Sequence, residues 1–232
     1  RSYFHHPAPD VLPGDYDKMR ERAAEYIAEL GIPKEIPQAA PRTKSTAAKF
    51  EASRFLDKSV EQCIAGLKSE DMYARRAAAA ALALRGSEGA PAASELVRLT
   101  EDPDVRLQAM RAIKSTGVAT PEVIAALGKQ LKDPDTFVRL GATYALGGLG
   151  EAAVEPLREV LYDSNALVVR AALGGLEALG PAAAPAVPDL IMLLVAMPAK
   201  LKHPLVAVIK NIGPDAAAAV PAVIKAYQHE RG

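Results

Sequence analysis

The sequence predicts an all-α fold, a right-handed α-solenoid (superhelix) of helical hairpins stacked in a row. Three observations lead to this fold class. Half of the 232 residues are apolar, yet only 5% are aromatic and tryptophan is absent, so alanine must fill much of the core. Closely packed helices suit alanine better than sheets do, because strands favour β-branched and aromatic residues. Apolar residues also recur at helical spacing, and the pattern returns about every thirty residues, as in helical repeat proteins.

Five glycines mark the repeat, since each follows an apolar helical pattern. A glycine just past a helix is a common stop, because it adopts the left-handed backbone conformation without a Cβ clash. The regular spacing therefore predicts one helix that ends at each glycine. The glycines are Gly86, Gly117, Gly150, Gly180 and Gly213, at intervals of 31, 33, 30 and 33 residues.

Each of these helices carries the same residue types at fixed distances before its glycine. Eleven residues before it stands a basic residue in four of the five copies, and the fourth copy has Val169 there with Arg170 beside it. Small or apolar residues stand eight before it, and Leu or Ile four before it. An upstream acid can cap the helix N-terminus, where backbone N–H groups lack partners. These acids are Asp71, Asp104, Asp135 and Asp163.

A second amphipathic run follows each glycine and usually has a proline near its start. Examples are "TPEVIAALGKQL" from Thr120 and "APAVPDLIMLL" from Ala184. Proline is tolerated in a first helical turn, where its missing N–H has no partner to lose. The predicted unit is a helix, a glycine turn, a second helix with an early proline and an Asp-rich turn, present four to five times.

The string V-R-x-x-A-x-x-A-L-x-x-L-G, read from Val138 to Gly150, resembles HEAT-like repeats of the short bacterial kind found in phycobilisome-lyase-type proteins. The resemblance covers roughly residues 67–228. The W-x-x-L-G and T-P-L-H signatures of the TPR and ankyrin families are missing. The resemblance to HEAT-like repeats implies an armadillo-like array that binds another protein, with the second helix of each repeat lining a concave face.

The N-terminal part of the chain does not follow the repeat. Residues 1–45 predict an extended, proline-rich arm with one short helix at about 15–31. Residues 46–232 predict the solenoid, with about five repeats and an N-terminal capping helix over 46–68. The chain begins at Arg1 rather than Met, so we expect a trimmed or processed N-terminus or a piece of a longer protein.

No motif in the sequence predicts catalysis, a cofactor or a metal site. Phosphate-loop, dinucleotide and G-x-S-x-G patterns are missing, and "GGLG" at Gly147–Gly150 ends a helix instead of opening one. The adjacent His5 and His6 lie on the proline-rich arm without coordination geometry. Cys63 is expected to be buried and inert. Nucleic-acid binding is not expected, because 28 basic and 28 acidic residues cancel.

Two sets of polar residues remain as candidate sites. The first set would bind a partner along the second helices: Glu95, Arg98, Glu122, Lys129, Glu155, Arg158 and Asp189. The second set would form a structural ladder of charge-assisted bonds between neighbouring repeats: Arg75, Asp104, Arg106, Asp135, Arg139 and Arg170.

The sequence therefore predicts a non-catalytic protein–protein interaction scaffold, a subunit or domain of a larger assembly. Its partner would be another protein, bound by the concave face, by the N-terminal arm or by the C-terminal repeat, whose outer face lacks a polar cap. Two alternatives remain open: a phycobilisome-lyase-like accessory factor that handles a tetrapyrrole or its carrier protein, and a regulatory or C-terminal domain of a larger enzyme. We expect a soluble protein of the cytoplasm or periplasm without membrane insertion, because the apolar run Ile191–Met197 is too short to span a bilayer.

Overall fold

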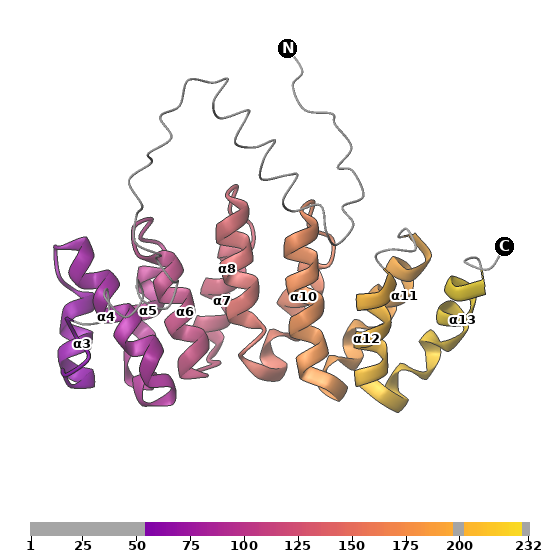
Figure 1. Cartoon of the computed structure of the whole chain (residues 1–232), viewed down its shortest axis with the longest axis horizontal. Coiled ribbons are helices and arrows are strands. Elements are labelled where there is room, and N and C mark those ends of the chain that lie inside the picture. Colours follow the sequence, from indigo (N-terminus) through magenta and orange to yellow (C-terminus); the bar gives the residue numbers. More distant parts are fainter. Residues whose placement is uncertain (1–53, 197–201, 229–232) are drawn as a thin grey trace, which may run out of the picture. The chain divides into compact units, whose positions relative to one another are not determined.

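The computed structural model describes residues 54–196 and 202–228, and the arm over 1–45 and the helix predicted at 15–31 lie outside them. The described part is built from helices joined by turns, with no strand in either range. The helices follow one another in sequence order (Figure 1). The all-α repeat fold predicted from the sequence is confirmed.

The helices form hairpins, each with a first helix before the glycine and a second helix after it. The chain enters the array through α3 (Val60–Leu67). The first helices are α4 (Met72–Arg85), α6 (Arg106–Thr116), α8 (Thr136–Leu146), α10 (Ala166–Leu179) and α12 (Lys202–Ile212). The second helices are α5 (Ala93–Leu99), α7 (Pro121–Gln130), α9 (Val154–Val160), α11 (Val187–Ala196) and α13 (Val220–Gln228).

All five glycines that mark the repeat have positive φ angles, between 56° and 78°. Four of them open a 3₁₀ segment before the second helix begins: Gly86–Ala92, Gly150–Ala153, Gly180–Ala186 and Gly213–Ala219. The turn after Gly117 differs, because Thr120 caps α7 with its side chain and Pro121 takes the first helical position. The glycine stop is confirmed in four of the five copies, whereas α8 ends at Leu146 with Gly147 as its C-cap, three residues before Gly150. The second helices other than α7 begin later than the sequence pattern indicates.

The core runs through both rows of helices. The alanines eight residues before the glycines, Ala78, Ala109, Ala142 and Ala172, are completely buried. Their small side chains let one first helix approach the next, and α4, α6, α8, α10 and α12 pack directly on their neighbours. Among the second helices, α9 makes only weak direct contact with α7 or α11. The first helices therefore form the more closely packed row.

The predicted capping helix over 46–68 is interrupted in its described part, since residues 54–59 are not helical, and residues 46–53 lie outside the described residues. The chain turns at residues 54–57, and α3 begins only at Val60. Ser59 adopts an extended conformation and accepts a bond from the Gln62 N–H, while the Gln62 side chain bonds back to the Ser59 N–H. This capping box starts a new helix, and its Ser-x-x-Gln signature is visible in the sequence.

Two stretches, Ala166–Ala196 and Lys202–Lys225, are apolar and long enough to meet the criterion for a membrane span. Gly180 and Gly213 divide them at left-handed backbone positions, so neither stretch is one continuous helix. The longest piece, α10, has 14 residues, which at 1.5 Å per residue is about 21 Å and short of a bilayer core of about 30 Å. Their apolar residues help to build the core of the array.

Candidate functional site

Ion pairs join consecutive first helices at their N-terminal ends. In each pair an arginine near the start of one helix reaches an aspartate in the turn before the next helix. The side chains are largely buried, with exposed fractions between 10% and 23%. The pairs are Arg75 with Asp102 at 2.9 Å, Arg106 with Asp133 at 2.9 Å, and Arg139 with Asp163 at 2.7 Å.

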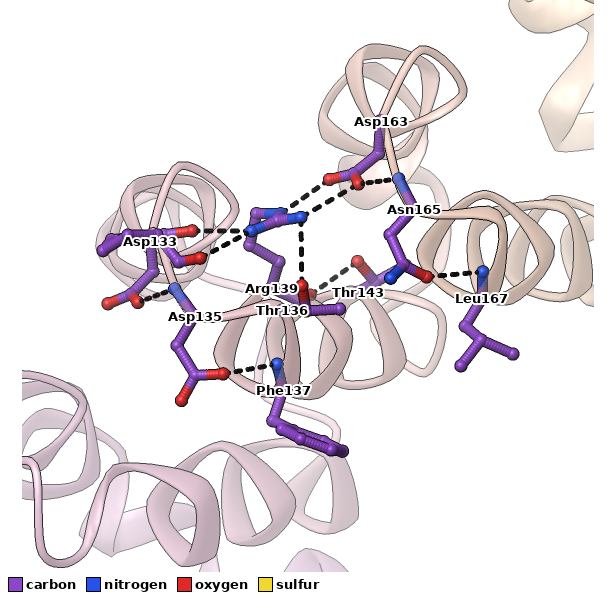
Figure 2. A network of polar contacts seen from close by, with 10 residues as sticks. Asp133, Asp135, Thr136, Phe137, Arg139, Thr143, Asp163, Asn165 and Leu167 are labelled. Carbon is purple, nitrogen blue, oxygen red and sulfur yellow. Dashed lines mark hydrogen bonds and ion pairs between the residues drawn. The ribbon is translucent and has the colours of Figure 1, made fainter. Parts of the chain in front are cut away.

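Arg139 also binds its own turn, donating to the carbonyl oxygens of Asp133 and Pro134 at 3.0 and 3.2 Å (Figure 2). The Asp163 carboxylate accepts from this guanidinium and from the backbone N–H of Asn165. The Arg139 hydrogen bond holds the pKa of Asp163 below its usual range. Each link therefore fixes two turns and the helix between them.

This ladder differs from the expected one in its acids. The first aspartate of each turn takes the arginine, whereas Asp135, the second, caps α8 through the Phe137 N–H and lies 4.0 Å from Arg106. Asp104 contributes only its carbonyl oxygen, which accepts from Arg76. Asp104 does not cap α6, whose N-cap is Val105 without a side-chain bond.

Arg170 is not part of the ladder. Val169 occupies the position equivalent to Arg139 and is buried. Arg170 is one residue further along α10, is exposed, and lines a groove on the outer side of the first helices. The slip of one residue in the fourth repeat therefore moves the cation from a structural position to an accessible one.

Six of the seven residues predicted to bind a partner along the second helices form ion pairs, most of them bridging neighbouring repeats. Lys129 pairs with Glu101 at 2.8 Å, and Arg158 bonds both Glu155 at 2.8 Å and Asp189 at 2.7 Å. Glu95 contacts Arg98 at 2.7 Å and Lys68 at 3.9 Å. Glu122, the seventh, is exposed in the first turn of α7. Their role in partner binding stays a prediction.

The first helices carry large apolar side chains that face solvent. One stands at the second position of each of four consecutive first helices. Figure 2 shows two of them, Phe137 and Leu167, extending away from Arg139. We call these four residues the apolar row: Tyr73, Leu107, Phe137 and Leu167, with exposed fractions of 65%, 45%, 71% and 51%.

A groove of about 360 Å³ crosses α6, α8 and α10 on the same helices. Glycines open it: a Cβ on Gly175 would lie 3.1 Å from the Cα of Gly147, so α8 and α10 approach closely there. A Cβ on Gly174 would meet nothing within 4 Å. Lys114 and Arg170 line the groove together with the half-exposed Tyr144.

No group of three or more His, Cys, Asp or Glu residues in the described ranges can hold a metal ion. Cys63 is fully buried, and this burial raises the pKa of its thiol. The histidines and acids of the arm lie outside the described residues.

Sequence reasoning missed both the apolar row and the groove. The apolar row could have been recognised in the sequence, because each of its residues stands at the start of a first helix and off the buried stripe of alanines and leucines. The groove had none, because it depends on which glycines of α8 and α10 meet in space.

Comparisons with known proteins agree with this architecture. An engineered protein of known crystal structure is 24% identical, covers 74% of this chain and 86% of its own, and has a TM-score of 0.53. A designed armadillo repeat protein in complex with the peptide (KR)4 is 18% identical, covers 75% and 96%, and has a TM-score of 0.52. A complex of two phycocyanin lyase subunits from Nostoc is 20% identical and covers 97% and 100%, but its TM-score is only 0.38.

No curated protein matches the sequence. The family model for HEAT repeats matches residues 91–180, which include the string from Val138 to Gly150. These residues form the helices from α5 to α10, and they include the ladder and the apolar row except for Arg75 and Tyr73 on α4. Residues 91–180 are therefore similar to HEAT repeats, and the described part of the chain has an all-α repeat fold.

Proposed function

We propose that the protein is a non-catalytic scaffold that binds another protein through the outer face of its first helices, as a subunit or domain of a larger assembly. The observation that supports this most is the apolar row. Single exposed apolar residues are common on protein surfaces, whereas apolar residues gathered on one face are typical of interaction sites. Phe137, the most exposed of the four, leaves 71% of its surface in water.

The ladder supports the same proposal, because it holds the residues of the row in register. Asp135 and Asn165 cap α8 and α10 by accepting from the N–H groups of Phe137 and Leu167 themselves. Arg139 ties these two turns together. A surface whose backbone is fixed before binding loses less conformational entropy when a partner arrives.

The packing of the two rows favours the first helices over the second as the binding face. The first helices are the more closely packed row, so their backbones are held in a fixed arrangement before a partner binds. The polar residues of the second helices are also largely engaged with one another. The designed armadillo repeat protein in complex with the peptide (KR)4 supports the use of such an array for binding a peptide.

The C-terminal hairpins offer a second candidate surface. Met192, Val195, Val220 and Ile224 on α11 and α13 are between 51% and 69% exposed. This cluster agrees with the expectation that the last repeat contacts another chain, and it can be tested beside the apolar row.

The test compares two pairs of substitutions in the full chain. We expect Phe137→Ser with Leu167→Ser to lose the proteins that the wild type recovers from a lysate of its source cell, as measured by mass spectrometry. Met192→Ser with Val195→Ser tests the rival C-terminal cluster, since it removes apolar surface of similar exposure from α11. If this second pair loses the partners and the first pair keeps them, the binding surface is the C-terminal cluster and the proposal is wrong.

A further inference from the structure

We infer that the partner presents an acidic, extended segment, and that one of its carboxylates docks in the groove between Lys114 and Arg170. The inference rests on the proposed function, because it names the chemistry of the segment that the first helices would hold. It is carried by the groove, by the cations at the groove and by the charge of the surrounding helices.

The groove is large enough for a side chain and is held open by the backbone. Its volume is about 360 Å³. The contact between Gly147 and Gly175 sets its floor, and the open space above Gly174 leaves room for a ligand atom. Because these positions lie on two packed helices, the groove exists before any ligand binds.

Two exposed cations line this groove. The ammonium of Lys114 lies 5.9 Å from the centre of the Tyr144 ring, and its carbon chain passes over Gly148. Arg170 belongs to α10 on the far side of α8. No acid among the described residues forms an ion pair with either cation, in contrast to the arginines of the ladder. A carboxylate placed between them would gain charge-assisted bonds.

The first helices are strongly biased in charge. Between their bounds they hold one acid, Glu177, while Arg111, Lys114, Arg170 and Lys210 are exposed cations. The acids of the ladder are already paired with arginines. The face is therefore complementary to a negatively charged partner.

The repeat spacing favours an extended segment. Packed helices are about 8–10 Å apart, and three residues of a polyproline II segment span about 9 Å. An extended chain can thus place one side chain on each successive first helix, alternating apolar contacts with Phe137 and Leu167 and an acidic contact in the groove. A nucleic acid would also bring negative charge, but the balance of 28 basic and 28 acidic residues gives the chain no general attraction for phosphates.

The experiment selects peptides from a random phage-displayed library on the full chain, then measures the strongest binder by fluorescence anisotropy. We expect the selected peptides to contain an excess of Asp and Glu over Lys and Arg. Arg170→Glu and Lys114→Glu should each weaken binding about tenfold, because each turns an attraction into a repulsion. Lys132→Glu is the matched control: its side chain is 78% exposed and pairs with Glu159 on the second-helix side. It should change the affinity less than about twofold.

Several results would overturn the inference. They are a selection that yields no peptides or peptides without acidic excess, an equal loss from Lys132→Glu, and binding of oligothymidylate as tight as that of the peptide. The proposed function can survive a failure of this inference. If Phe137→Ser weakens the peptide and Arg170→Glu does not, the first-helix face binds partners but the groove does not take their carboxylate.

Discussion

Alanine substitutions at two adjacent glycines in α10 should change the free energy of unfolding in opposite directions. Gly174 and Gly175 both lie inside the helix, where alanine is favoured over glycine by about 0.5–1 kcal/mol. A Cβ on Gly174 meets nothing within 4 Å, so Gly174→Ala should stabilise the protein by about that amount. A Cβ on Gly175 would lie 3.1 Å from both the Gly147 Cα and the Leu157 Cδ1.

The cost at Gly175 follows from what its new methyl would touch. Leu157 can move its side chain, but the Gly147 Cα can move only with the backbone of α8. Overpacking of this kind costs about 1–3 kcal/mol, which exceeds the gain in helix propensity. We therefore expect Gly175→Ala to be destabilised by about 1 kcal/mol and to differ from Gly174→Ala by about 2 kcal/mol.

Urea unfolding followed by far-UV circular dichroism measures this difference. With a slope of about 2 kcal/mol per molar urea, the two midpoints should be about 1 M apart, with unchanged slopes. Equal midpoints, or a higher midpoint for Gly175→Ala, would refute the close approach of α8 and α10 and the groove that it bounds.

The remaining predictions concern the turns and the ladder. Gly117→Ala should lower the free energy of unfolding by about 1 kcal/mol and Gly117→Asn by less, since φ is 68° and space is open there. Urea unfolding that gives the same loss of free energy for both variants would contradict this prediction. Arg139→Gln should lower the urea midpoint more than Lys129→Gln, because the side chains are 14% and 69% exposed; a larger effect at Lys129 would argue against the ladder. The pKa of Asp163 is lowered in the fold, so its contribution to stability is complete above the ordinary carboxylate range and is lost as the pH falls through the lower folded pKa. Urea midpoints measured below about pH 4 should therefore fall more steeply in the wild type than in Arg139→Gln; parallel curves would exclude this linkage.

The fold could be predicted because each repeat carries sequence signals that act locally. Each glycine stop needs only its own left-handed φ, and each buried alanine needs only its place on the helix. The capping box at Ser59 was also readable, although the apolar pattern before it suggested a longer helix. Such signals are short-range, so they can be recognised in a single sequence.

The polar contacts of the site depend on how the repeats pack against one another, which the local sequence does not specify. In a turn with two aspartates, either can cap the helix and either can take the arginine, and only the packing of the repeats assigns Asp133 to Arg106. The slip at Val169 was visible, but its consequence for Arg170 required the position of the groove. The preference for the second helices came from the family resemblance, which does not report how this chain distributes its exposed apolar residues.

Photocrosslinking tests most directly the claim that partners bind the outer face of the first helices. Benzoylphenylalanine is placed at Phe137 in one protein and at Tyr162 in another; these residues are 71% and 52% exposed and lie on α8 and just after α9. After irradiation with the partner recovered from the source cell, we predict a crosslinked product from position 137 and none from position 162. A product from position 162 alone would contradict the assignment and place the partner on the second helices.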